Sequence, residues 1–293
     1  MRLGRRGVVI LGLAAIVGLS LAVVGRFFGR SRLRFPYLSG SLPAAEYREL
    51  ASQPGWSASR ITVAPGIELN GLVRRPQAQG QGQGQGQGNA APWLLFYQGN
   101  DAHMLRVGQA FLNRIGADRD WGLAVYAYRG YDSSDGTPHY ADLAADAPQI
   151  LEQLCASEHV ERSRVHLVGF SIGGHFAVRA MDVAAKLQPK PASLTLLAAV
   201  NDIVMVRRSF YDKFDPGDDF QTEPFLDAIP APVLLVQGTA DEALAGPGQG
   251  RAISAHLGAR ARYLELPGVG HVALMSDPAA IAATQEFIAA HSK

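Results

Sequence analysis

Five residues, Gly169-Phe170-Ser171-Ile172-Gly173, form a G-x-S-x-G pattern. An apolar run at 165–168 leads into the pattern, and a segment of helical composition follows it. In a strand, turn and helix of this kind, the serine stands at a sharp turn with its Oγ exposed. The pattern therefore predicts that Ser171 is a nucleophile. The alternative is a serine in an ordinary glycine-rich turn.

A serine nucleophile needs a base to take its proton and an acid to orient that base. Asp241 follows the apolar run 233–236, and His271 follows the apolar segment 263–266. Ser171, Asp241 and His271 thus occur in the chain order Ser, Asp, His, each just after a predicted strand. Because the carboxyl ends of parallel strands share one edge of a sheet, we expect these three side chains to lie together.

The sequence leaves alternatives open for the acid and for the histidine. Asp202 is an alternative acid, because it also follows an apolar run, at 194–200. The position of Asp241, two strands before the end of the chain, favours Asp241 over Asp202 as the acid. Asp241 could otherwise serve as a turn or helix-cap residue, and His271 could be a surface histidine in a glycine-rich loop.

Two backbone N–H groups are expected to form an oxyanion hole. One is the N–H of Ile172, directly after the nucleophile. The other is the N–H of Asn100, in the turn Gln98-Gly99-Asn100-Asp101 that follows the apolar segment 93–97. Asn100 and Asp101 could equally cap the helix that follows.

The elements that must position these residues alternate between apolar strands and helices. This alternation predicts an α/β fold, with a mostly parallel sheet covered by helices on both faces. Strands are expected at 60–63, 67–73, 93–97, 123–128, 165–170, 194–200, 233–236 and 263–266, and helices at 44–51, 103–115, 140–154, 250–257 and 278–290.

The N-terminal residues differ in kind from the rest. The segment 7–25 contains no charged residue and is flanked by arginines on both sides. At about 1.5 Å per residue, such a helix nearly matches a bilayer core of about 30 Å. The segment predicts a single-pass signal anchor. The alternatives are a cleaved signal peptide and a buried core helix.

These features divide the chain into an N-terminal anchor or signal segment (1–34), a linker (35–59) and a catalytic domain (60–293). The pattern is interrupted at 201–230, where five aromatic residues favour a short cap insertion: Phe210, Tyr211, Phe214, Phe220 and Phe225. The cap would cover an apolar acyl pocket. A plain hydrophobic contact between this loop and the core is the alternative.

Composition limits the classes of function. The chain has 293 residues, of which 47% are hydrophobic, so it can bury a sizeable core. The net charge of +1 gives no indication of nucleic-acid binding. A single cysteine, Cys155, excludes an intramolecular disulfide framework and a cysteine-based zinc site.

The ordered motifs resemble those of the α/β-hydrolase superfamily over about residues 60–293, and within it the Bem46-like group, which is related to serine aminopeptidase-like hydrolases. The motifs are Gln98-Gly99-Asn100, Tyr128-Arg129-Gly130-Tyr131-Asp132-Ser133-Ser134-Asp135-Gly136, the Ser171 turn, Gly238-Thr239-Ala240-Asp241 and Gly268-Val269-Gly270-His271. Two residues depart from the usual pattern, because Gln98 replaces a His and Asp132 replaces a Gly.

The resemblance implies hydrolysis without a metal or an organic cofactor. We expect a serine hydrolase of carboxylic esters, either acyl or lipid-like, that acts on a small-molecule acyl substrate. An aminopeptidase-like enzyme, a thioester or amide hydrolase, and a catalytically silent membrane-bound scaffold are the alternatives. The catalytic domain is expected on the extracytoplasmic side of the membrane, or in the periplasm or medium after signal cleavage.

Overall fold

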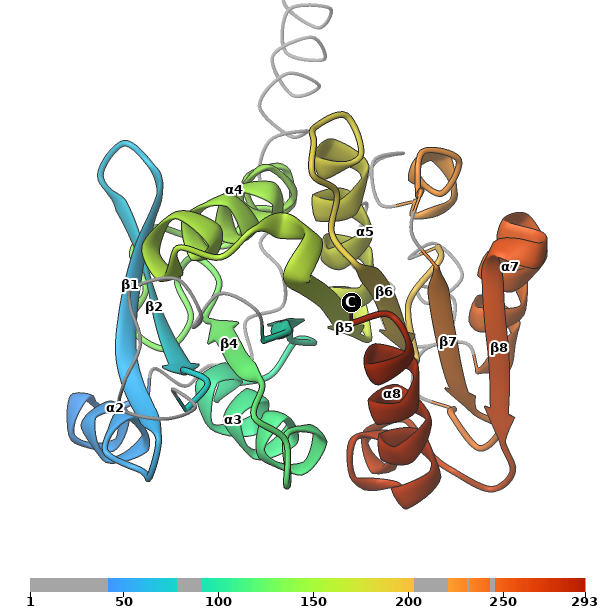
Figure 1. The fold of residues 1–293 in the computed structure, drawn as a ribbon, viewed down its shortest axis with the longest axis horizontal. Helices are drawn as coiled ribbons and strands as arrows, with labels where there is room; N and C mark the ends of the chain where they lie inside the picture. The colour runs from blue at the N-terminus through green and yellow to red at the C-terminus, as the bar shows by residue number, and fades with distance from the viewer. Residues whose placement is uncertain (1–41, 78–90, 203–220, 231, 243–245, 293) are drawn as a thin grey trace, which may run out of the picture.

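The computed structural model describes residues 42–77, 91–202, 221–230, 232–242 and 246–292. Within them, eight strands form one sheet in the order β1-β2-β4-β3-β5-β6-β7-β8 (Figure 1). The strands are β1 (Trp56–Ala64), β2 (Ile67–Arg74), β3 (Trp93–Tyr97), β4 (Gly122–Tyr126), β5 (Val165–Phe170), β6 (Ser193–Leu197), β7 (Val233–Gly238) and β8 (Ala261–Leu266).

The sheet is parallel from β4 to β8, whereas β2 pairs antiparallel with both β1 and β4. The α-helices are α2 (Ala44–Ala51), α3 (Met104–Ile115), α4 (Tyr140–Glu158), α5 (Ile172–Ala184), α7 (Pro247–Leu257) and α8 (Pro278–Ala290). The short 3₁₀ turns within the described residues are η1 (Arg162–Arg164), η3 (Glu223–Phe225), η4 (Gly258–Arg260) and η5 (Val272–Ser276). The expected α/β class is confirmed.

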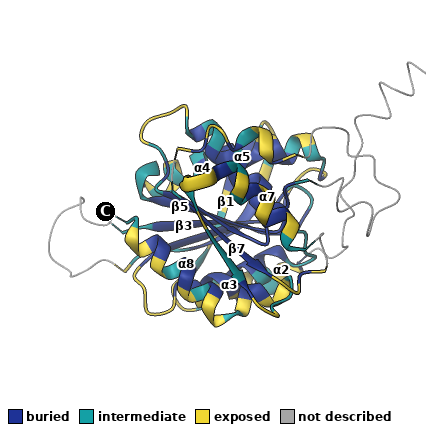
Figure 2. Ribbon diagram, turned by 90° about the vertical axis from the view of Figure 1, so that its right-hand side faces the viewer, coloured by how far each residue is buried: buried dark blue, intermediate teal, exposed yellow. Residues whose placement is uncertain are grey.

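Helices cover both faces of the sheet. Figure 2 shows α4, α5 and α7 on one face and α2, α3 and α8 on the other. Every residue of the strands β3 to β7 is buried, as expected for a parallel sheet enclosed on both sides. This explains why these segments read as continuous apolar runs in the sequence.

The first strand begins earlier than expected, at Trp56, inside the segment assigned to the linker. Its residues Ser57, Ala58 and Ser59 have little intrinsic preference for strand. They pair with Gly71–Val73 of β2, and Trp56 pairs with Arg74, so the neighbouring strand sets where β1 begins.

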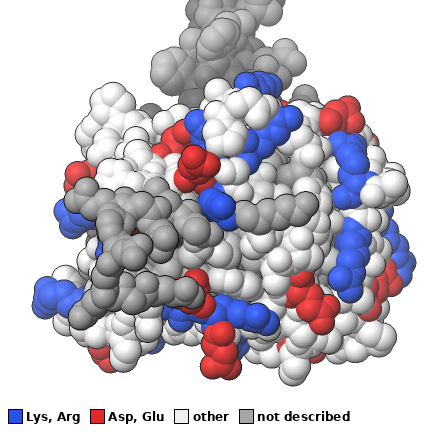
Figure 3. Space-filling model, in the orientation of Figure 1, with Lys and Arg blue, Asp and Glu red and all other residues white. Residues whose placement is uncertain are grey.

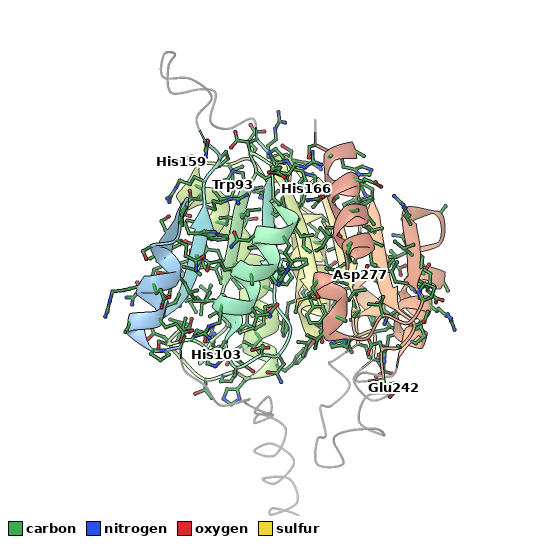
Figure 4. All side chains as sticks on the ribbon, turned by 90° about the horizontal axis from the view of Figure 1, so that it is seen from below. Trp93, His103, His159, His166, Glu242 and Asp277 are labelled. Carbon is green, nitrogen blue, oxygen red and sulfur yellow. The ribbon has the colours of Figure 1, made fainter. Side chains whose placement is uncertain are left out.

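The topology places the turns after β3, β5, β7 and β8 at one edge of the sheet. In Figure 4, His103 and Glu242, which lie beyond β3 and β7, appear at one edge of the sheet. Trp93 and His166, from the beginnings of β3 and β5, appear at the opposite edge. The chain reverses its direction of winding between β3 and β5, and open α/β sheets bind ligands at such a switch point.

Two expectations fall outside the described residues: the apolar segment 7–25 and the insertion residues 203–220. In the part of the chain that the structure describes, no helix combines the length and apolar character needed to cross a bilayer. On the face shown in Figure 3, acidic and basic side chains are interspersed and do not gather into one basic surface.

Candidate active site

Ser171 occupies a strained turn between β5 and α5. Its backbone has φ 57° and ψ −126°, a combination that a residue with a Cβ adopts rarely. The N–H of Ser171 donates to the carbonyl of Leu197 at 2.9 Å, which fixes the turn to β6. A Cβ at Gly173 would collide with the carbonyl oxygens of Tyr97 and Gln98. The glycine therefore lets α5 begin directly against the end of β3.

The two predicted oxyanion donors belong to the start of α5 and to the turn after β3. Ile172 is the first residue of α5, so its N–H has no acceptor within the helix. The turn after β3 contacts the serine directly, because a Cβ at Gly99 would lie 3.1 Å from Cβ of Ser171. Asn100, next in this turn, accepts a hydrogen bond on Oδ1 from the Tyr131 hydroxyl at 2.8 Å.

His271 and Asp241 form a hydrogen-bonded pair. His271 Nδ1 lies 2.8 Å from Asp241 Oδ2, and the two side chains are 12% and 3% exposed. Because an ionised carboxylate only accepts hydrogen bonds, Nδ1 carries the proton in this pair and Nε2 of a neutral ring is left as the basic nitrogen. The imidazole packs against the ring of Phe170, with centroids 4.8 Å apart. His271 therefore lies beside the residue that precedes Ser171.

The loops that carry this pair are joined to each other by backbone contacts. The N–H groups of Thr239 and Ala240 donate to the carbonyls of Leu266 and Val269, each at 3.0 Å. The N–H of Gly268 donates to Thr239 Oγ1 at 2.9 Å. The turn after β7 and the turn after β8 thus form one unit.

The structure does not make every predicted contact. Among the described residues, no hydrogen bond joins Ser171 Oγ to His271. Such bonds in catalytic sites often tighten only when the substrate is bound. Asp202, the alternative acid, forms an isolated bridge with Gln221.

Two buried glutamines near the site were not expected from the sequence. Gln237, on β7, donates from Nε2 to Asp241 Oδ2 at 3.0 Å. Gln249, on α7, accepts the N–H groups of Asn201 and Asp202 on Oε1 at 2.7 and 2.9 Å. A polar residue within or beside an apolar strand is the only signal that could have indicated Gln237.

The two departures from the family pattern have distinct surroundings. Gln98 is 1% exposed, and its carbonyl accepts the Tyr128 hydroxyl at 2.8 Å. Asp132 has φ 44°, a conformation that Asp tolerates better than most residues with a Cβ. Its Oδ2 accepts the N–H of Leu105, in the first turn of α3, at 2.7 Å. Burial raises the pKa of the Asp132 carboxyl to about 6.

Comparison of the sequence with known proteins finds relatives that match about half of this chain. No family model matches the chain. An uncharacterized protein of Mycobacterium tuberculosis is 30% identical over 156 residues, covering 51% of this chain and 53% of that protein. Protein bem46 of Schizosaccharomyces pombe is 25% identical over 171 residues, with 53% of each covered. The human alpha/beta hydrolase domain-containing protein 17B is 27% identical over 156 residues, covering 53% and 52%. The chain spans about half the length of these relatives.

Solved structures share the fold at low sequence identity. The Pyrococcus furiosus esterase Pf2001 superposes with a TM-score of 0.66 at 12% identity, covering 89% of this chain and 98% of the esterase. A puromycin-hydrolyzing peptidase of Mycobacterium tuberculosis gives a TM-score of 0.62 at 17% identity, covering 83% of this chain and 41% of the peptidase. At these identities the comparison concerns the fold alone.

Proposed function

For this chain, which has the α/β-hydrolase fold and resembles Bem46-like proteins in sequence, we propose serine hydrolase activity toward carboxylic esters, through an acyl-enzyme on Ser171. The observation that carries the proposal is the pair of His271 and Asp241, joined at 2.8 Å and packed against the residue before Ser171. These residues supply the base and the acid that activate a serine.

In the first half of the reaction, Ser171 Oγ attacks the acyl carbonyl carbon of the ester. His271 Nε2 takes the hydroxyl proton, and Asp241 stabilises the resulting imidazolium through its bond to Nδ1. The carbonyl becomes a tetrahedral oxyanion, which the N–H groups of Ile172 and Asn100 stabilise by about 3 kcal/mol each. His271 then returns its proton to the alkoxide leaving group, and the acyl group remains on Ser171.

In the second half, water takes the place of the alcohol. His271 removes a proton from the water as it attacks the acyl carbonyl, and the same two N–H groups stabilise the second oxyanion. The proton then passes to Ser171 Oγ as the acyl bond breaks, which releases the carboxylic acid and restores the serine.

A fluorophosphonate probe tests the nucleophile. We expect covalent labelling of the full chain, loss of labelling in Ser171→Ala, and retention in Ser157→Ala, because Ser157 lies on α4 and its Oγ donates to the nearby carbonyl of Leu154. Labelling of Ser171→Ala at the unaltered rate would contradict the proposal.

Aryl esters compared with aminoacyl anilides test the substrate class. The proposal expects turnover of esters in preference to anilides, and loss of both in Ser171→Ala. A clear preference for aminoacyl anilides would indicate the aminopeptidase-like alternative. Labelling without turnover of any acyl substrate would favour a scaffold that retains the fold.

The proposal includes a location at the membrane, through residues 7–25. The absence of charge in this segment supports an anchor, and Arg2, Arg5 and Arg6 would hold its N-terminus in the cytoplasm. The arginines at 26, 30, 32 and 34 oppose this orientation. Intact mass of the protein from the membrane fraction distinguishes a retained anchor from a chain that starts near Arg26. Protease protection in sealed vesicles tests the side on which the catalytic domain lies.

A further inference from the structure

We infer that Gln237 is a positioning residue that holds the carboxylate of Asp241 in place for His271. This inference rests on the proposed function, because it assigns a role within the same set of groups. Gln237 Nε2 lies 3.0 Å from Asp241 Oδ2, the oxygen that also accepts from His271 Nδ1 at 2.8 Å. The same carboxylate oxygen therefore accepts from two donors: Gln237, on β7, and His271, in the turn after β8.

The surroundings of Gln237 fix its side chain. Gln237 is 2% exposed and lies near the end of β7. A Cβ at Gly250 of α7 would lie 3.2 Å from Gln237 Oε1, so the helix packs closely over the amide. The carboxylate accepts hydrogen bonds and cannot donate, so the amide nitrogen faces Asp241 and the amide oxygen faces α7.

An amide suits this position chemically. His271 gains a positive charge during attack, and the strength of its bond with Asp241 then depends on the position of Oδ2. The Gln237 amide donates to the carboxylate without gaining or losing a proton, so it constrains Oδ2 and leaves the charge of the site unchanged. Since this orientation acts on the chemical step more than on substrate binding, its loss is expected to appear in kcat.

Two substitutions in the full chain test the hydrogen bond, with an ester as substrate. Gln237→Leu removes the donor at similar volume and is expected to lower kcat about tenfold with little change in KM. Gln237→Glu keeps the shape of the side chain. A protonated carboxyl at this position donates the same bond, whereas an ionised carboxyl repels Asp241. The kcat of Gln237→Glu relative to the unaltered protein is therefore expected to fall as the pH rises.

A matched control separates positioning from general damage to the core. Gln109, on α3, is also 2% exposed, and its Nε2 donates to the carbonyl of Leu50 at 2.9 Å. Gln109→Glu is expected to lower the melting temperature without making kcat fall with pH. All assays are made below the melting temperature of each variant, so that loss of the fold is not read as loss of positioning.

Two outcomes distinguish the inference from the proposed function. If Gln237→Leu kept its kcat and Gln237→Glu followed the pH profile of the unaltered protein, the inference would be overturned while the labelling of Ser171 still supported the hydrolase. If the unaltered protein failed to react with the fluorophosphonate at Ser171, both would be overturned.

Discussion

Thr222, in the described part of the 201–230 insertion, is hydrogen-bonded to His175 on α5, the helix that begins directly after Ser171. Thr222 Oγ1 lies 3.0 Å from His175 Nδ1 and donates its own proton to the Val200 carbonyl at 2.7 Å. Since the hydroxyl has one proton, it accepts from Nδ1, and Nε2 of a neutral ring accepts from the Tyr140 hydroxyl at 2.8 Å. Burial, assisted by Arg179, lowers the pKa of His175 to about 3.

The buried His175 predicts that the free energy of unfolding falls at acidic pH. A histidine whose pKa is lowered in the folded state contributes stability that is fully present above its unfolded pKa, about 6.5, and that is lost as the pH falls toward 3. In His175→Leu, we expect a lower free energy of unfolding at pH 7, because hydrogen bonds are lost, and a weaker dependence on pH between 7 and 4. Urea unfolding at several pH values measures both effects.

Part of this pH dependence is expected to remain in His175→Leu. His166 is also fully buried, and burial lowers its pKa to about 4. Its ring nitrogens lie 2.7 Å from Ser193 Oγ and 3.0 Å from Ser292 Oγ. An unaltered dependence on pH in His175→Leu would show that His175 is not held neutral by the fold.

Asp132 is expected to make the free energy of unfolding depend on pH in the opposite direction. Its pKa is raised in the folded state to about 6, so the folded protein loses stability relative to the unfolded chain as the pH rises from about 4 to 6. Asp132→Asn keeps an oxygen for the N–H of Leu105 and removes the buried charge. We expect the variant to be more stable than the unaltered protein by about 1–3 kcal/mol at pH 8.

The advantage of Asp132→Asn should shrink as the pH falls toward 4, where the carboxyl of the unaltered protein is neutral. Thermal or urea unfolding at pH 8 and pH 4 measures the difference. Equal stabilisation at both values would mean that a change in packing, and not the removal of charge, is the cause.

The assignment of Asp241 predicts a large loss of activity on substitution. Asp241→Asn replaces the acceptor of the His271 proton by an amide and favours the wrong tautomer, so kcat should fall by several orders of magnitude. Asp202→Asn is the matched comparison and should cost much less. Ester turnover by the two purified variants measures the ranking, and the reverse order would move the acid to the turn after β6.

Alanine in place of Gly173 is expected to clash with the backbone, whereas alanine in place of Gly248 is not. Gly173→Ala places a methyl group against the carbonyls of Tyr97 and Gln98, so we expect destabilisation of about 1–3 kcal/mol and reduced ester turnover. Gly248→Ala is the control, because nothing lies within 4 Å of a Cβ at that helical position. Alanine there should be neutral or stabilising by up to about 1 kcal/mol. Similar effects of the two substitutions on melting temperature and turnover would argue against this steric account.

The sequence predicted the fold and the His271–Asp241 pair for one reason. Asp241 and His271 each follow an apolar strand, and parallel strands bring their carboxyl ends to one edge. Helix α2 was predicted within its observed bounds, Ala44–Ala51.

The roles of Gln237 and His175 could not be predicted in this way. Gln237 follows the apolar run 233–236 within β7, and His175 lies within helix α5. The partners of His175, which are Thr222 and Tyr140, are distant in the chain, so that contact leaves no local pattern. Gln237 is only four residues from Asp241, but the sequence does not show that its side chain turns toward the carboxylate. The early beginning of β1 at Trp56 was missed for a related reason, since only its pairing with β2 specifies it.

The closeness of Asp202 and Gln221 within the 201–230 insertion has a consequence for how the length of the segment between them can change. The N–H of Thr222 donates to the carbonyl of Asn201 at 2.8 Å, and Asp202 pairs with Gln221, so the described residues on the two sides of 203–220 lie next to each other. A segment whose ends already meet can be lengthened at an entropic cost of only about 0.6 kcal/mol per doubling, without pulling on the sheet. Segments of other lengths are therefore expected to fit between Asp202 and Gln221 while the eight-stranded sheet stays unchanged.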